Sequence, residues 1–259
     1  MKHHILPYMP DRPVKPRKTG LTMVMDKGLS IREAEDFMSV GSEYTDMVKL
    51  GFGTCLLTPG VAGKIAVYKE SGCIPYFGGT LFEAYVIRNM FSNFLDLLDE
   101  YGIDLVEVSD GSYDIDHVKK LEYIEKLAEK RTVISEVGSK KKDVLYSPEE
   151  WVFMMKSELE AGSVKVIAEA RESGTIGIYN DDGSVNQILI NAISENVSLE
   201  NVIWEAPLKT QQAWFIKHFG ANVNLGNISP GEIIPLESLR TGLRGDTFFQ
   251  FLPSELYQK

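Results

Sequence analysis

The chain has 259 residues, of which 44% are hydrophobic and 25% are charged. These proportions are typical of a folded globular protein and exclude disordered and collagen-like chains. The formal net charge of -10 argues against a general attraction to nucleic acid or to anionic lipid, so an anionic ligand would need cations gathered in a pocket.

The cysteine content and the hydropathy pattern indicate a cytoplasmic protein without a membrane partner. Cys55 and Cys73 are too few for a disulfide framework and form no C-x-x-C pair, as expected in a reducing compartment. No apolar run approaches the ~20 residues of a membrane span. Residues 1–20 are basic and contain prolines but lack the apolar segment of a signal peptide, so we expect an arm there and one domain over residues 21–259.

Eight short apolar or β-branched runs, separated by helical patterns, predict eight strands. The predicted strands are Leu21–Met25, Met47–Leu50, Cys73–Tyr76, Asp104–Val108, Thr132–Ser135, Ser163–Ile167, Asn201–Trp204 and Asn222–Leu225. Capping signals at Ser30 and Ser147 predict helix starts, and apolar spacing predicts helices over Leu81–Tyr101, Asp116–Lys130 and Glu232–Leu243.

The repeated strand and helix pattern predicts a fold of the α/β class, a single (β/α)8 TIM-type barrel. An open, doubly wound sheet is the rival architecture. The first strand is not followed by G-x-G-x-x-G, and polar residues follow nearly every strand, whereas an open sheet concentrates them at one switch point. These two features favour the barrel.

Acidic residues stand at the ends of five predicted strands. They are Asp26, Glu107, Glu136, Glu169 and Glu205. Because side chains alternate along a strand, the glutamates share a face with apolar residues and would converge at the mouth of a barrel. Mutual repulsion there calls for a counter-charge, and an oxygen-rich set suits Mg²⁺. The alternative is that some of these acids form ion pairs with neighbouring cations.

Two lysines are candidate catalytic residues. Lys49 stands in an otherwise apolar strand, so it is either paired with a barrel glutamate or directed at an anionic substrate. Lys140 follows the fifth strand, where a lysine could deliver a proton to an enolate carbon.

Candidate substrate-binding residues follow the first, sixth and eighth strands. They are Lys27, Arg171, Ser173, Gly174, Asn224, Gly226 and Asn227. A guanidinium, a hydroxyl and flexible backbone suit phosphate, and barrel phosphate sites often follow the last two strands.

In order along the chain, these motifs resemble the phosphosulfolactate synthase family. The motifs are Met23–Gly28, Lys49–Thr54, Gly78–Glu83, Glu107–Ser112, Glu136–Gly138, Glu169–Gly174, Glu205–Pro207 and Leu243–Phe248. The resemblance implies a Mg²⁺-dependent (β/α)8 enzyme that joins sulfite to phosphoenolpyruvate, forming (2R)-2-O-phospho-3-sulfolactate. In methanogens this reaction opens a route to coenzyme M, and in spore-forming bacteria it serves sulfolactate production.

The resemblance also implies a role for Lys140 as general acid, although this chain has Ser139-Lys140 where a lysine pair is usual. The family includes plant heat-stress-associated proteins, so a non-catalytic binding protein is one alternative. Another phosphate-handling barrel enzyme, such as an aldolase with a Schiff-base lysine, is a second. Apolar outer helix positions near Phe91 and Trp151 indicate a homo-oligomer.

Overall fold

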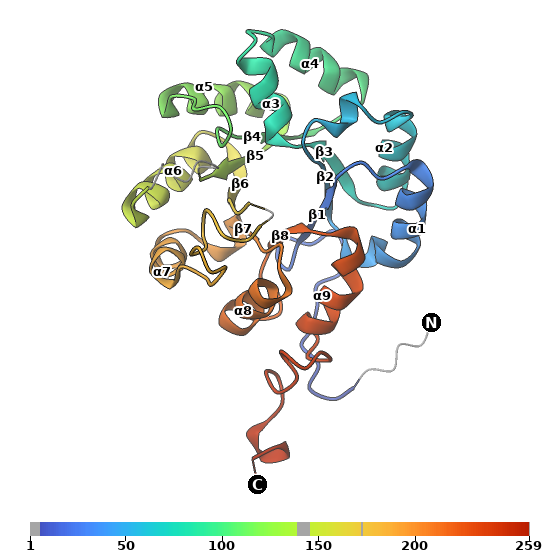
Figure 1. The fold of residues 1–259 in the computed structure, drawn as a ribbon, viewed down its shortest axis with the longest axis vertical. Helices are drawn as coiled ribbons and strands as arrows, with labels where there is room; N and C mark the ends of the chain where they lie inside the picture. Colours follow the sequence, from blue (N-terminus) through green and yellow to red (C-terminus); the bar gives the residue numbers. More distant parts are fainter. Residues whose placement is uncertain (1–5, 139–145, 172, 259) are drawn as a thin grey trace.

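The computed structural model describes residues 6–138, 146–171 and 173–258, and within them eight strands form one parallel sheet. The strands are β1 (Thr22–Asp26), β2 (Met47–Leu50), β3 (Ile74–Phe77), β4 (Leu105–Val108), β5 (Thr132–Val137), β6 (Ser163–Ala168), β7 (Val202–Glu205) and β8 (Leu225–Ile228). Their hydrogen-bonded order is β3-β2-β1-β8-β7-β6-β5-β4. Because β3 and β4 lie beside each other, the sheet is a nearly closed barrel (Figure 1). The predicted (β/α)8 fold is confirmed.

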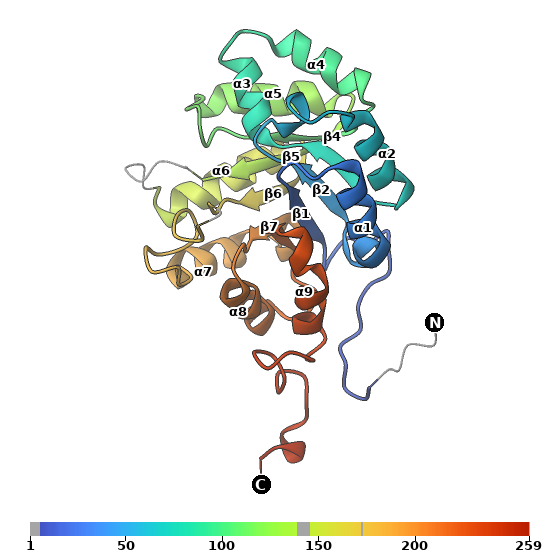
Figure 2. The same ribbon diagram turned by 45° about the vertical axis from the view of Figure 1, so that its right-hand side comes forward.

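Helices surround the barrel on its outer side in both views (Figures 1 and 2). They are α1 (Ile31–Gly41), α2 (Val61–Glu70), α3 (Gly79–Val86), α4 (Phe91–Glu100), α5 (His117–Ala128), α6 (Pro148–Glu160), α7 (Gln187–Asn196), α8 (Lys209–Phe219) and α9 (Ile233–Arg240). Both predicted capping boxes form, at Ser30 with Glu33 and at Ser147 with Glu150. None of the helices in the described part of the chain combines the length and the apolar character needed to cross a membrane.

Side chains alternate along each strand, which explains how charged residues reach the barrel interior. In β7, the ring of Trp204 stacks on Phe215 of α8 outside the barrel, whereas Ile203 belongs to a different cluster, which also contains Met23 and Ile167. Glu205 continues the inward series at the carboxyl end of the same strand.

Three predicted elements differ from the structure by three residues or more, and one of them is the helix expected over Glu232–Leu243, which ends at Arg240. The helix expected over Leu81–Tyr101 is interrupted between α3 and α4, where Asn89 adopts a φ of 56° that a helix cannot contain. The last strand was expected over Asn222–Leu225 but forms three residues later, because residues after Gly220 turn before the sheet begins and Asn224 bonds to other segments. Because of this shift, the candidate site residue Asn224 lies before β8 and not at its carboxyl end.

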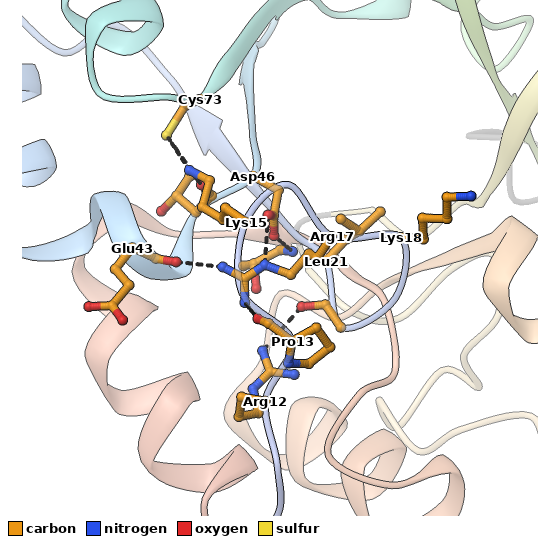
Figure 3. A network of polar contacts seen from close by, with 12 residues as sticks. Arg12, Pro13, Lys15, Arg17, Lys18, Leu21, Glu43, Asp46 and Cys73 are labelled. Carbon is orange, nitrogen blue, oxygen red and sulfur yellow. Dashed lines mark hydrogen bonds and ion pairs between the residues drawn. The ribbon is translucent and has the colours of Figure 1, made fainter. Parts of the chain in front are cut away.

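The N-terminal arm packs on the end of the barrel where the strands begin. Figure 3 shows Lys15 and Arg17 directed from the arm toward Cys73 and Asp46. The Arg17 Nε lies 2.9 Å from Asp46 Oδ1, and the Lys15 Nζ lies 3.0 Å from the Ser42 carbonyl oxygen. Arg12 joins the arm to Glu237 of α9 through a 2.8 Å ion pair. The arm therefore covers the end of the barrel opposite the strand carboxyl ends.

Candidate functional site

A cavity of about 600 Å³ opens at the carboxyl ends of the strands. It is lined by Met25, Lys49, Gly51, Phe52, Gly78, Thr80, Gly111, Ser112, Glu136, Glu169, Ala170, Arg171, Ser173, Glu205 and Asn227. In barrels of this type the strand carboxyl ends carry the active site. The cavity is therefore the candidate active site.

The buried Lys49 is the central cation of this cavity. Its Nζ lies 2.8 Å from Glu107 Oε1, 3.0 Å from Glu136 Oε2 and 3.8 Å from Glu205 Oε1. Burial alone would lower the pKa of Lys49, but the attraction of the glutamates is larger in sum and raises that pKa well above its ordinary value. The surrounding carboxyl groups therefore favour the ammonium form of Lys49, which is not a nucleophile.

Glu107 is bonded on both carboxylate oxygens. Besides the contact with Lys49, Oε1 accepts from the Gly79 N–H at 2.5 Å, and Oε2 accepts from the Tyr76 hydroxyl at 3.1 Å. Burial, and secondarily the neighbouring Glu136, raise the pKa of Glu107 against the opposing effect of Lys49. A Cβ at Gly79 would lie 2.2 Å from Ser109 Oγ, so only glycine lets the N–H approach so closely. Glu107 therefore holds the Lys49 ammonium in place. It is not among the residues that line the cavity.

Three of the predicted metal-binding acids come together as a cluster. Each of Glu136, Glu169 and Glu205 can offer one carboxylate oxygen such that all three oxygens lie within 4.8 Å of one another. All three side chains are buried and line the cavity. Burial raises the pKa of Glu205 to about 7, with Lys49 opposing and Glu136 adding to the shift. Clustered carboxylate oxygens are the donor set that Mg²⁺ prefers, so these residues fit such an ion.

The structure does not bring Asp26 into this cluster. Asp26 Oδ2 lies 2.8 Å from Lys64 Nζ and accepts from the Tyr68 hydroxyl at 2.8 Å. Its Oδ1 accepts from the N–H groups of Gly28 and Leu29, both at 2.8 Å. The prediction of a metal ligand at Asp26 therefore needs correction, because its oxygens are occupied and it holds the loop after β1.

Of the residues predicted to bind substrate, Arg171, Ser173 and Asn227 line the cavity. Asn227 donates to the Ala170 carbonyl oxygen at 3.2 Å and lies 3.4 Å from Glu205 Oε2, which links the loop after β8 to the cluster. Lys27 is exposed and is not among the lining residues. Lys140, one of the two predicted catalytic residues, lies outside the described residues.

The remaining three residues that were predicted to bind substrate support the fold instead of lining the cavity. Asn224 lies before β8, at the opposite end of the barrel, where its amide donates to the Val202 carbonyl oxygen at 3.1 Å; its predicted binding role is therefore corrected. A Cβ at Gly226 would lie 2.7 Å from Met23 Cε, so this glycine permits close packing inside the barrel. Gly174 is held by the Gln211 amide, which donates to its carbonyl oxygen at 2.9 Å.

Sequence reasoning missed the residues that hold the loops around the mouth. Glu83 in α3 accepts from the N–H groups of Ser112 and Tyr113, at 2.8 and 2.6 Å, and so fixes the loop after β4. Lys120 in α5 donates to Asp110 at 2.9 Å and to the Glu136 carbonyl oxygen at 2.7 Å, which ties the loops after β4 and β5 together. The signal in the sequence was a charged residue at a helix position whose spacing from apolar residues places it on the buried face.

Comparisons with known proteins agree on one family. Residues 10–246 match the family described as (2R)-phospho-3-sulfolactate synthase (ComA). The chain is 42% identical over 244 residues to the phosphosulfolactate synthase of Bacillus subtilis, covering 93% of this chain and 97% of that protein. It is 40% identical over 244 residues to the phosphosulfolactate synthase of Methanothermobacter thermautotrophicus, covering 92% and 95% respectively. Among solved structures, 3-hexulose-6-phosphate synthase superposes with a TM-score of 0.56 at 15% identity, covering 85% of this chain and 99% of that one, a likeness of fold alone.

Proposed function

The chain belongs to the (2R)-phospho-3-sulfolactate synthase family, and we propose that it joins sulfite to phosphoenolpyruvate with Mg²⁺ as cofactor. The product would be (2R)-2-O-phospho-3-sulfolactate. The observation that carries the proposal is the cluster of Glu136, Glu169 and Glu205 around an already paired Lys49 at the mouth of the barrel.

The charges inside the mouth support a divalent cation. Glu136, Glu169 and Glu205 bring three buried carboxyl groups together beside the ammonium of Lys49. A divalent cation held by these groups would add positive charge at the point where two anionic substrates must meet. Glu136, Glu169 and Glu205 would hold Mg²⁺, which would stabilise the negative charge that develops on the substrate carboxylate during addition.

The reaction requires one bond to sulfur and one proton transfer. The sulfur lone pair of sulfite attacks the methylene carbon C3 of phosphoenolpyruvate, and the electrons of the C2–C3 double bond move toward the carboxylate. C2 then takes a proton from one face, which sets its configuration. We assign that proton to Lys140, which in the sequence comes three positions after the end of β5 at Val137 and four after the lining residue Glu136.

Cations and polar groups at the rim would bind the phosphate and the sulfite. Arg171 and Ser173 line the cavity from the loop after β6, and their guanidinium and hydroxyl groups suit anionic oxygens. Lys49 would act at longer range as a fixed positive charge. Because its pKa is raised, it would not serve as the Schiff-base lysine of an aldolase, which makes that alternative less favoured.

The test is incubation of the purified chain with phosphoenolpyruvate, sulfite and Mg²⁺, followed by mass spectrometry for the sulfolactate phosphate. Product that disappears on addition of EDTA and returns with Mg²⁺ supports the proposal. Product formed in EDTA would refute the role of the metal. Absence of product over a range of pH would favour a non-catalytic role for this family member, and a borohydride-trapped adduct with a sugar phosphate would favour an aldolase.

A further inference from the structure

An aromatic side chain stands in an unusual backbone conformation at the rim of the cavity. Phe52, in the loop after β2, lines the cavity, has a φ of 55° and is 50% exposed. Bulky side chains seldom adopt this left-handed conformation, since their Cβ crowds the following carbonyl oxygen. Exposure of half an aromatic ring to water is unfavourable as well. Two unfavourable features at one position next to a site suggest a use for the ring.

The neighbouring residues hold the backbone of Phe52 in place. A Cβ on Gly51 would lie 2.5 Å from Met25 Sδ, so the chain passes closer to β1 than another residue would allow. The Gly51 N–H donates to the Asp26 carbonyl oxygen at 3.0 Å, and the Thr54 N–H and hydroxyl donate to the Gly51 carbonyl oxygen at 2.9 and 2.8 Å. Gly53 has a φ of 66° on the other side. The ring is therefore presented at the rim by a constrained loop.

Phe52 is the one aromatic side chain among the described residues that line the cavity. The glutamates, Arg171, Ser173 and Asn227 suit the phosphate, the carboxylate and the metal, whereas Phe52 offers a large apolar surface. The apolar part of phosphoenolpyruvate is its C3 methylene, the carbon that sulfite must reach.

We propose that Phe52 is a specificity-determining residue that packs against the C3 methylene of the bound enol phosphate. The inference rests on the proposed function and extends it, since it names what selects an unsubstituted methylene carbon. A ring packed against the C3–H edge, in the plane of the double bond, leaves a face of C3 open to sulfite. It leaves no space for an in-plane substituent on that carbon, so it rejects larger 2-phosphoenolates by contact. One methyl group in such a contact changes kcat/KM by about 10- to 200-fold.

The experiment compares phosphoenolpyruvate with its C3-methyl analogue, 2-phosphoenolbutyrate, as sulfite acceptors. For wild type we expect a strong preference for phosphoenolpyruvate. Phe52→Gly should reduce that preference by about tenfold or more, because space opens beside the C3–H edge for an in-plane methyl group. Phe52→Tyr should retain it. The matched control is Leu57→Ala, a residue of the same loop that is 81% exposed and does not line the cavity; it should leave both kcat/KM values unchanged.

Thermal unfolding separates a contact with substrate from a structural role. Glycine accepts a φ of 55° without crowding, so Phe52→Gly should keep its Tm within about 3 °C of wild type while its discrimination falls. Wild-type turnover with an unchanged ratio in Phe52→Gly, or a changed ratio in Leu57→Ala, would overturn the inference alone. Wild type without any product from phosphoenolpyruvate and sulfite would overturn the proposed function and this inference with it.

Discussion

Substitution Lys49→Met removes the ammonium group that Glu107, Glu136 and Glu205 contact, while it retains a side chain of similar length. At an effective dielectric constant of about 20, two unit charges 4 Å apart attract by about 4 kcal/mol, and two of the contacts of Lys49 are shorter, at 2.8 and 3.0 Å. Desolvation of the ammonium offsets much of this attraction. The net cost of removing one partner from a buried pair is about 3–5 kcal/mol, which corresponds to a decrease in Tm of order 10 °C in a chain of this size.

The assay is thermal unfolding in EDTA, so that no metal compensates for the lost charge. Glu107→Gln added to Lys49→Met supplies the internal check: Glu107 contacts Lys49 but does not line the cavity. The double variant should be about 1–3 kcal/mol more stable than the sum of the two single-variant changes in unfolding free energy predicts. The double variant should not regain activity. If Lys49→Met unfolds at the wild-type temperature, or if Glu107→Gln brings no recovery, the interpretation of Lys49 as a counter-ion is wrong.

The pH dependence gives a second check on the same variant. Burial raises the pKa of Glu205 to about 7 in the folded state, above its ordinary value of 4.5. Stability linked to such a carboxyl group is present below its unfolded pKa and is lost as the pH rises through its folded pKa. Loss of Lys49 raises this folded pKa further. The deficit of Lys49→Met should therefore shrink as the pH falls from 8 toward 5, and a constant deficit would contradict this account.

Three further predictions concern the metal, the proton donor and a corrected residue. Mg²⁺ at 100 times its Kd should add about 2.7 kcal/mol to the stability of the wild type, and Glu169→Gln should lose most of this shift; an equal shift in the variant would exclude Glu169 as a ligand. Lys140→Ala should bind phosphoenolpyruvate in calorimetry as the wild type does but lose turnover by roughly 100-fold or more, whereas full activity would remove Lys140 from the mechanism. Asp26→Asn should lower the Tm because it leaves the buried Lys64 without its carboxylate, yet the Mg²⁺ shift should persist; loss of that shift would return Asp26 to the metal site.

The sequence predicted most of the fold because local periodicity and global architecture agree. Strands buried on both faces read as short apolar runs, and the helices between them carry capping signals such as Ser147 with Glu150. The errors arose where tertiary contacts determine the ends of an element. The apolar spacing of Leu81–Tyr101 does not reveal the break at Asn89, because the apolar positions of α4 pack against α3, as Phe94 does on Phe82, and so continue the helical pattern.

Only the part of the candidate site that follows from the alternation of side chains along the strands could be predicted from the sequence. The two-residue period places Glu136 and Glu205 inward, and an inward lysine in an apolar strand must find an acid, so their association with Lys49 follows from the sequence. No feature of the neighbouring sequence distinguishes Asp26 from these glutamates. Its partners Lys64 and Tyr68 lie on α2, and only the folded chain shows that they occupy its oxygens.

The division of charge between the barrel interior and its rim would allow an acidic chain to act on the proposed anionic substrates. Lys49 is paired with glutamates and therefore contributes little free positive charge to a ligand. Under the proposed function, direct contacts with phosphate or sulfite would come from residues on the loops, such as Arg171 and Ser173, and from backbone N–H groups. Loops tolerate change better than barrel strands do. The interior would thus determine which metal ion is bound, while the rim, including Phe52, would determine which acceptor is chosen, and each could change without the other.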